Sequence, residues 1–286
     1  MLRTILNGFI LVVIGMSLLL PQVGVARDGI YYRDQVAVLM YHHVSDTDES
    51  SSTITTDLFR SQLTYLRDKG YTFITPEELH GFLEGGAVPP NAVLVTFDDG
   101  YASFYEHAYP ILEQLQVPAV NFLITETLDH PDYNPYIGAI PFMSREQVRD
   151  MTHKTSWVKA ACHTNGNHNK QDGKAYLTNR LSINNVVETE QQYEERILWD
   201  TQACLQEVSA LTDEMTIDLA YPFGISTEKA RELLQQCGVK FAYTITPQMT
   251  TRSTDPMRIP RINGGSPDVS PELLHQTIVR RVVKSP

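Results

Sequence analysis

The feature that most constrains the fold is an apolar run that ends in two adjacent carboxylates. Residues 92–97 are apolar or β-branched, and Asp98, Asp99 and Gly100 follow them directly. A continuous apolar run of this length predicts a strand buried on both faces, as in a parallel sheet covered by helices. Carboxylates at that depth are tolerated when they are paired or bind a metal. A solvated Asp-Asp-Gly turn is the plainer interpretation, because these residues are common in turns.

Further strand-like runs alternate with helical patterns along the chain. Strands are expected at residues 36–41, 71–74, 92–97, 118–124, 157–162, 217–221, 239–245 and 258–262. This alternation predicts a parallel sheet, and about seven repeats predict a barrel. We therefore expect an α/β fold, a distorted (β/α)7 TIM-like barrel, in a single catalytic domain over residues 27–286. The polar stretch 165–187 lacks clear periodicity and is expected to be a long loop that either shapes a substrate groove or decorates the rim.

The first 26 residues form a separate segment in which Arg3 is the only charge. The pattern predicts a secretory signal peptide, and the uncharged run is also long enough to be an uncleaved membrane anchor. Export is therefore expected, with a periplasmic, secreted or membrane-anchored product. The net charge of −11 and the lack of a Lys/Arg cluster in the sequence argue against a nucleic-acid partner and a basic membrane-binding face.

The chain has three cysteines, Cys162, Cys204 and Cys237. An odd count gives no complete disulfide framework. Core packing is the expected role of Cys204 and Cys237, which both lie among helical residues.

Polar residues follow four of the expected strands. They are His42–His43, Asp98–Asp99, His163 and Pro222–Gly224. The carboxyl ends of barrel strands share one face, and active sites are built there.

His163 and His168 lie five positions apart in a glycine-containing loop, which allows both imidazoles to reach one ion. With one carboxylate of the Asp98–Asp99 pair they would make a two-histidine, one-carboxylate site. Zn²⁺ fits that set, with Co²⁺, Ni²⁺, Fe²⁺ or Mn²⁺ as alternatives. A His-rich polar loop that holds no ion is the plainer interpretation.

Three motifs carry a family resemblance. Residues 96–101, the His163/His168 pair and residues 220–224 resemble, in the same order, the polysaccharide deacetylases of carbohydrate esterase family 4, the NodB-homology domain. The resemblance covers roughly residues 36–262. The H-x-x-x-x-H spacing and residues 39–43 are similar to the poly-β-1,6-N-acetyl-D-glucosamine N-deacetylases of biofilm exopolysaccharide systems.

The resemblance implies a role for each matching residue. Asp98 would be the general base, and Asp99, His163 and His168 would hold one divalent metal ion, with Zn²⁺ expected. The backbone N–H of Tyr101 would stabilise the oxyanion, and Tyr221, Pro222 and Phe223 would line the substrate groove.

The chain departs from the family pattern in two places. Many relatives carry a base-orienting arginine where this chain has Ala220. Arg258 or Arg261 is a substitute, although a surface ion pair is the expected role of each. The late Leu-x-His motif that supplies the general acid in the family has no secure match. Leu273–His275 has the same pattern but lies in the expected last helix, after the barrel, so we expect this match to be coincidental. His42 or His43 becomes the candidate acid.

The expected function is a metal-dependent N-deacetylase that acts on N-acetylglucosamine units of an extracellular polysaccharide, with poly-β-1,6-N-acetyl-D-glucosamine preferred. Chitin or peptidoglycan is the alternative substrate. An inactive carbohydrate-binding relative, and a deacetylase or esterase of small molecules or acylated sugars, are the alternative functions.

Overall fold

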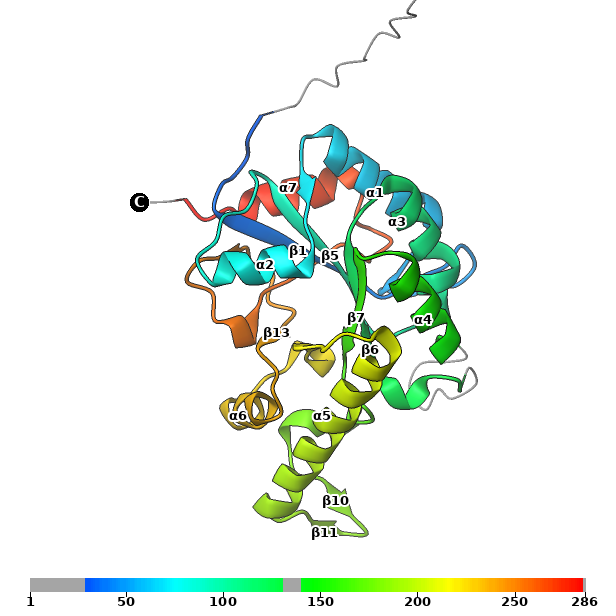
Figure 1. The fold of residues 1–286 in the computed structure, drawn as a ribbon, viewed down its shortest axis with the longest axis vertical. Coiled ribbons are helices and arrows are strands. Elements are labelled where there is room, and N and C mark those ends of the chain that lie inside the picture. The colour runs from blue at the N-terminus through cyan, green and yellow to red at the C-terminus, as the bar shows by residue number, and fades with distance from the viewer. Residues whose placement is uncertain (1–28, 131–139, 285–286) are drawn as a thin grey trace, which may run out of the picture.

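A curled sheet of parallel strands forms the centre of the protein, and helices pack around its outside (Figure 1). The computed structural model describes residues 29–130 and 140–284. The segment 1–26, expected to be a signal peptide or an anchor, lies outside them. The strands of the barrel are β1 (Gln35–Tyr41), β5 (Ala92–Phe97), β6 (Ala119–Leu123), β7 (Val158–Cys162), β12 (Asp218–Ala220), β13 (Phe241–Tyr243) and β15 (Ile262–Asn263).

The order of these strands closes the sheet into a barrel. Neighbours follow the order β13-β12-β7-β6-β5-β1, and β15 pairs with β1 through Leu39 and Ile262. One parallel bridge between Tyr243 and Ile259 joins β13 to the segment that leads into β15. The predicted distorted (β/α)7 barrel is therefore confirmed. Two short strands, β4 (Thr72–Phe73) and β14 (Thr250–Thr251), extend the sheet at the amino ends of β5 and β1.

The helices cover the outer face of the barrel, and several begin at a side-chain cap. Capping boxes start α2, α4 and α5 at Thr75, Ser144 and Thr189, where the cap residue and the third helical residue bond each other's backbone N–H. The helices are α1 (Thr56–Asp68), α2 (Pro76–Leu83), α3 (Tyr109–Leu115), α4 (Arg145–Lys154), α5 (Glu190–Thr212), α6 (Glu228–Gln236) and α7 (Pro271–Arg281). Among the described residues, none of these helices is both long enough and apolar enough to cross a membrane.

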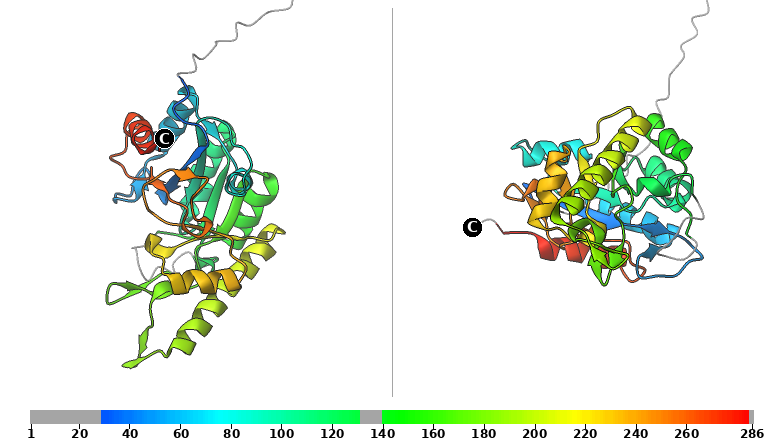
Figure 2. Two further views of the ribbon diagram at one scale, coloured as in Figure 1. Left: turned by 90° about the vertical axis from the view of Figure 1, so that its left-hand side faces the viewer. Right: turned by 90° about the horizontal axis from the view of Figure 1, so that it is seen from below.

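The stretch expected to be one long loop contains two small hairpins. They are β8 (Lys170–Gln171) with β9 (Lys174–Ala175), and β10 (Ser182–Ile183) with β11 (Val186–Val187). The second hairpin and the first turns of α5 project beyond the barrel (Figure 2). The short parallel pair β2 (His43–Val44) and β3 (Thr53–Ile54) lies at the carboxyl end of β1.

The cysteines differ from the expectation. Cys162, the last residue of β7, forms a disulfide bond with Cys204 of α5. Cys204 is fully buried, but simple core packing is the wrong description of it. The two cysteines lie 42 positions apart, and no local pattern signals their pairing, because only the packing of α5 against the barrel brings them together. Cys237 is a free cysteine and is partly buried.

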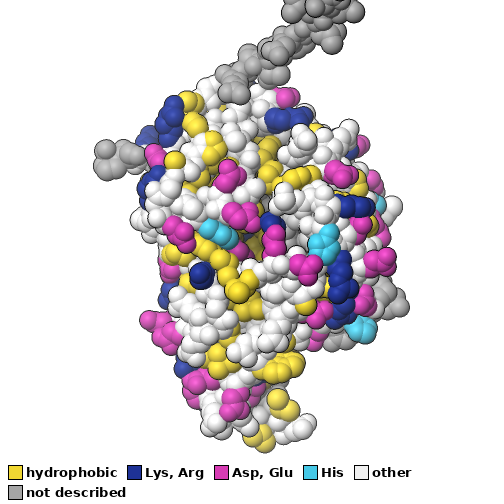
Figure 3. Space-filling model, in the orientation of Figure 1, with side chains coloured by type: hydrophobic (Ala, Val, Ile, Leu, Met, Phe, Trp, Pro, Cys, Tyr) yellow, Lys and Arg dark blue, Asp and Glu magenta, His cyan; other side chains and the backbone are white. Residues whose placement is uncertain are grey.

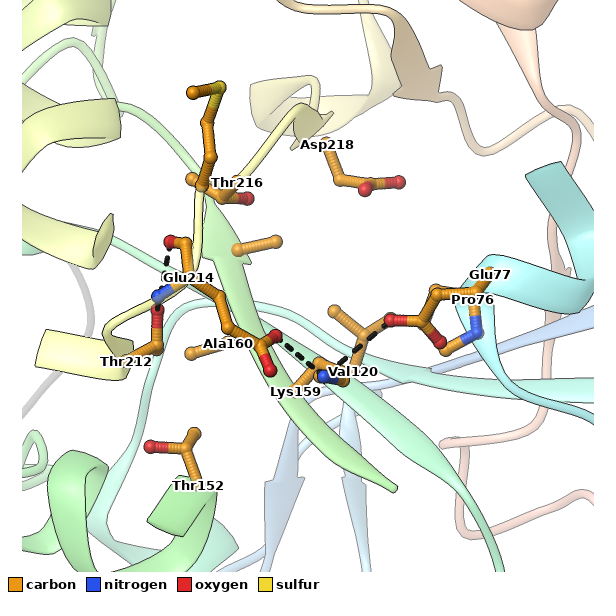
Figure 4. A pocket seen from close by; sticks show the side chains of 12 residues that line it. Pro76, Glu77, Val120, Thr152, Lys159, Ala160, Thr212, Glu214, Thr216 and Asp218 are labelled. Atoms are coloured by element: carbon orange, nitrogen blue, oxygen red, sulfur yellow. Dashed lines mark hydrogen bonds and ion pairs between the residues drawn. The ribbon is translucent and has the colours of Figure 1, made fainter. Parts of the chain in front are cut away.

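The amino ends of the strands carry ion pairs. A small cavity of about 60 Å³ lies there between α2, β7 and the turn after α5. Figure 4 shows Lys159 reaching between two carboxylates, and its Nζ lies 2.6 Å from Glu214 Oε2 and 3.6 Å from Glu77 Oε1. These partly exposed pairs contribute little to stability individually. On the face in Figure 3, acidic side chains are spread out and interspersed with Lys and Arg.

Candidate active site

The opposite end of the barrel holds a cavity of about 440 Å³. Its walls come from the segments that follow β1, β5, β7 and β12, as expected for an active site at the carboxyl ends of barrel strands. Seven residues predicted for the site line it: His42, Asp98, Asp99, Tyr101, His163, His168 and Phe223. The serines of 50–52 form another part of the wall.

Asp99, His163 and His168 converge inside this cavity. Asp99 Oδ1 lies 3.4 Å from Nε2 of His163 and 3.4 Å from Nε2 of His168. One ligand atom from each residue lies within 4.8 Å of the others, and all three side chains are buried. Nδ1 of His163 lies 2.8 Å from the carbonyl oxygen of Ala220, so Nδ1 donates a proton there and leaves the Nε2 lone pair free. The donor set and its arrangement fit one divalent metal ion.

The surroundings of Asp99 and His168 favour the protonation states that bind a metal. Burial raises the pKa of Asp99, but hydrogen bonding to His163 and the charge of His168 outweigh it and hold this pKa well below its usual range. Burial lowers the pKa of His168 to about 4, so this imidazole is neutral at pH 7. A carboxylate and a neutral imidazole are the forms that bind a metal. Burial also lowers the pKa of His163, but Asp98 and Asp99 outweigh it and raise this pKa overall.

Asp98 is held by a buried arginine. The guanidinium of Arg261 donates from Nη1 to Oδ1 at 2.6 Å and from Nη2 to Oδ2 at 2.7 Å. Arg261 is fully buried, and its Nε donates to the carbonyl oxygen of Thr244 at 2.9 Å. Burial raises the pKa of Asp98, but Arg261 and then His163 outweigh it and lower this pKa. The expectation of a surface ion pair for Arg261 is therefore wrong.

A signal for Arg261 was present in the sequence. Arg261 stands between Ile259 and Ile262, and both isoleucines are buried in the segment that closes the barrel. An arginine inside an apolar strand requires a buried partner. The partner is not deducible from the sequence, because it lies 163 residues away.

The two histidines after β1 have different surroundings. His43 is bonded on both ring nitrogens, with Nδ1 at 2.7 Å from Ser103 Oγ and Nε2 at 2.9 Å from Asp48 Oδ2. The side chain of His42 is 23% exposed, and its Nε2 lies 3.9 Å from Asp98 Oδ2. Nδ1 of His42 is buried without a hydrogen-bond partner in the described part of the chain. The geometry therefore favours His42 over His43 as a proton donor inside the cavity.

The residues expected to line the groove separate into two groups. Phe223 borders the cavity, with its ring centroid 4.8 Å from that of His168 and 4.1 Å from Lys170 Nζ. Tyr101 also borders it. Tyr221 and Pro222 are buried and do not line this cavity. The Tyr221 hydroxyl instead donates to the carbonyl oxygen of Met257 at 3.0 Å. The strand ends at Ala220, and of the 3-10 turn that follows, Phe223 and Gly224 line the cavity whereas Pro222 does not.

His275 lies elsewhere. Its Nδ1 is 2.8 Å from the Tyr71 hydroxyl, and its ring packs edge-on against Tyr31. The cavity is lined by other residues, which agrees with the expectation that the Leu273–His275 match is coincidental.

Replacing Gly224 by Ala is expected to lower the free energy of unfolding by about 1–3 kcal/mol. Gly224 has a φ of +68°, and a Cβ there would lie 2.7 Å from the backbone nitrogen of Ile245. Denaturant unfolding measures the loss. Gly81→Ala is the matched control, because Gly81 lies in α2 with open space around it and should lose nothing. Equal midpoints for the two variants would contradict the expectation.

Comparison with known proteins agrees with this architecture. The family model described as polysaccharide deacetylase matches residues 85–242. A poly-beta-1,6-N-acetyl-D-glucosamine N-deacetylase of Staphylococcus aureus (strain MRSA252) is 24% identical over 223 residues, which are 78% of this chain and 71% of that protein.

Two solved structures share the fold. A de-N-acetylase from Aggregatibacter actinomycetemcomitans superposes with a TM-score of 0.76 and 23% identity, covering 86% of this chain and all of the other. IcaB from Ammonifex degensii gives a TM-score of 0.72 and 26% identity, covering 85% and 97% of the two chains. The family model covers more than half of this sequence, and the chain belongs to the polysaccharide deacetylase family.

Proposed function

We propose that the protein is a metal-dependent N-deacetylase that removes acetyl groups from N-acetylglucosamine units of an exported polysaccharide. Poly-β-1,6-N-acetyl-D-glucosamine is the proposed substrate, and Zn²⁺ is the proposed ion. The observation that carries the proposal is the buried Asp99–His163–His168 set beside Asp98, which Arg261 holds by two hydrogen bonds. The names of the relatives in Staphylococcus support the choice of polymer.

Hydrolysis of an acetamide needs an activated water, a polarised carbonyl and a proton for the departing nitrogen. When bound by Asp99, His163 and His168, the ion would lower the pKa of its water and polarise the acetyl carbonyl. Asp98 is the proton acceptor for the attacking water. Both of its oxygens are fixed by Arg261, which also keeps the carboxyl ionised.

Residues around Asp98 protonate the leaving nitrogen, stabilise the oxyanion and bind the sugar. His42, with Nε2 at 3.9 Å from Asp98 Oδ2, donates the proton to the nitrogen as the C–N bond breaks and acetate leaves. The backbone N–H of Tyr101 stabilises the developing oxyanion, a role worth about 3 kcal/mol in comparable enzymes. Phe223 offers an aromatic face at the cavity rim for a sugar ring.

The position of Arg261 argues against the alternative that the protein is an inactive carbohydrate-binding relative. The absence of a base-orienting arginine at Ala220 and the lack of a secure general acid favour that alternative. A buried arginine from the segment just before β15 contacts Asp98, and Asp98, Asp99, His163 and His168 line the same cavity. These contacts support a catalytic role over carbohydrate binding alone.

Removing the metal with a chelator is expected to lower acetate release by about 100-fold or more, because the ion supplies several kcal/mol of stabilisation. Added Zn²⁺ should restore activity, and Co²⁺, Ni²⁺ and Fe²⁺ are compared with it. Unchanged turnover in protein that holds far less than one metal ion per chain would contradict a metal-dependent mechanism.

A panel of polymers tests the substrate. Acetate release is measured with β-1,6-linked N-acetylglucosamine oligomers, chitin oligomers and peptidoglycan under one set of conditions. The β-1,6 oligomers should give the highest kcat/KM. Acetate release from chitin or peptidoglycan, with none from the β-1,6 oligomers, would show that the proposed substrate is wrong. Polymer binding without acetate release at full metal occupancy would favour the inactive alternative.

A further inference from the structure

One face of α5 follows the loop that carries the two metal-site histidines. Arg196, Asp200 and Cys204 are spaced four residues apart, so they form a single stripe along the helix. Each residue of the stripe contacts the segment 162–167, and the contacts run in reverse order along it. The helix and the loop therefore run antiparallel to each other and are joined at three points.

Asp200 holds the middle of the loop. Its Oδ1 accepts the backbone N–H of Gly166 at 2.7 Å, and its Oδ2 accepts that of Asn165 at 3.1 Å. The carboxylate is buried, with 3% of its surface exposed. Burial raises the pKa of Asp200, and the loop N–H groups oppose that rise. These bonds fix the two peptides halfway between His163 and His168.

Arg196 and Cys204 hold the two ends. Nη1 of Arg196 donates to Asn167 Oδ1 at 3.0 Å, next to His168 in the sequence. Arg196 is itself fixed by Glu188, whose Oε1 accepts from Nε at 2.7 Å. At the other end, the disulfide from Cys204 attaches to Cys162, the residue before His163.

Contacts with α5 therefore fix the chain just before His163, between His163 and His168, and just before His168. A histidine ligand must keep its ring position within a few tenths of an ångström to bind a metal well, and groups behind the ligands set that position. The backbone at Thr164 has a φ of +79°, a conformation that a free loop rarely holds without outside contacts.

We propose that the Arg196–Asp200–Cys204 stripe is a template that sets the spacing of His163 and His168, and that the Cys162–Cys204 disulfide is a positioning link on which metal affinity depends. The inference rests on the proposed metal site. The three stripe residues act through the loop and are positioning residues. Oxidised protein would then bind metal tightly, and the same protein with the disulfide reduced would bind it more weakly.

Metal affinity of the full chain tests this inference. Because Cys162 and Cys204 are fully buried, the protein is unfolded in denaturant with a phosphine and then refolded. The phosphine breaks the S–S bond, with two electrons from phosphorus and two protons from water giving two thiols and the phosphine oxide. Zinc dissociation constants are measured by competition with a chromogenic chelator, before reduction, after reduction and removal of the phosphine under argon, and after reoxidation. Reduction should weaken zinc binding by about 10- to 100-fold, the range for groups behind metal ligands, and reoxidation should restore it.

Substitutions separate positioning from general stability. Cys204→Ser and Asp200→Asn should each weaken zinc binding by about 10-fold or more, and the double variant should lose less than the product of the two. Cys237→Ser and Glu195→Gln are the controls, because Cys237 is free and Glu195 lies on the exposed side of α5. All variants are assayed about ten degrees below their unfolding midpoints, so that unfolded protein does not enter the comparison.

Two results would overturn the inference. One is a zinc affinity of the folded, reduced protein within twofold of the oxidised value, since a purely structural disulfide would move only the unfolding midpoint. The other is a count of three free thiols in the denatured protein as purified, where one is expected. Oxidised protein that binds no zinc at all would overturn the proposed metal site and this inference together.

Discussion

Asp98→Asn is expected to lower kcat/KM for the acetylated polymer by about 10²- to 10⁴-fold, the range for loss of a general base. The amide cannot accept the proton of the attacking water. It keeps one oxygen that can accept a hydrogen bond from Arg261, but the second hydrogen bond and the charge partner of the guanidinium are lost, so the variant is assayed well below its unfolding midpoint. The metal ligands Asp99, His163 and His168 remain in place.

The measurement pairs acetate release with metal content. Asp98→Asn should retain stoichiometric metal, whereas the control Asp99→Asn should lose metal affinity because it removes a charged ligand. Loss of metal from the Asp98 variant would assign that residue to the ligand set. Near-normal turnover with metal bound would move the role of base to another group, and His42 would be the first to examine.

The parts of the site that follow a local pattern were predictable. An apolar strand that ends in Asp98–Asp99, and two histidines after another strand, place their side chains at one end of any parallel barrel. Side-chain position depends mainly on the strand that carries each residue. For this reason the pattern grouped His163 and His168 with one carboxylate of the Asp98–Asp99 pair, and the family resemblance indicated Asp99 as that ligand.

The contacts that were missed join segments far apart in the chain. Arg261 reaches Asp98 because the last strand closes the barrel beside β1, and Cys204 reaches Cys162 because α5 packs on β7. Pattern and composition do not encode such pairings. The orientation of Tyr221 was missed for another reason: the chain leaves its strand at Ala220, and one residue of difference decides which side chain faces the cavity.

The helical stripe of α5 is an intermediate case. The spacing of Arg196, Asp200 and Cys204 is readable in the sequence, and a charged pair beside a cysteine on the buried side of a helix calls for polar partners. The identity of those partners required the fold, because the loop residues that Arg196 and Asp200 contact lie 29 to 35 positions earlier in the chain.

Arg261→Met is expected to lower the free energy of unfolding by about 3–5 kcal/mol and to reduce kcat/KM at least as strongly as the loss of the base. Arg261 is fully buried and Asp98 is 3% exposed, so the variant leaves a buried carboxylate without its partner. Methionine keeps much of the apolar volume of the side chain, which limits the loss from packing. Denaturant unfolding of metal-free protein measures the effect.

The effect of Arg261→Met should depend on pH in a known direction. The lowered pKa of Asp98 means that the unfolded chain binds more protons than the folded one, so the pair stabilises the protein above the ordinary carboxyl pKa and this contribution is lost as the pH falls. In the variant, burial acts without the guanidinium and raises the pKa of Asp98. The difference between wild type and variant should therefore grow from pH 3 to pH 7. The double variant Asp98→Asn/Arg261→Met should recover part of the lost stability at pH 7, because it buries no unpaired charge. A double variant as unstable as the sum of the two single variants would show that the two side chains contribute independently, and Arg261 would then have no special role in holding the base.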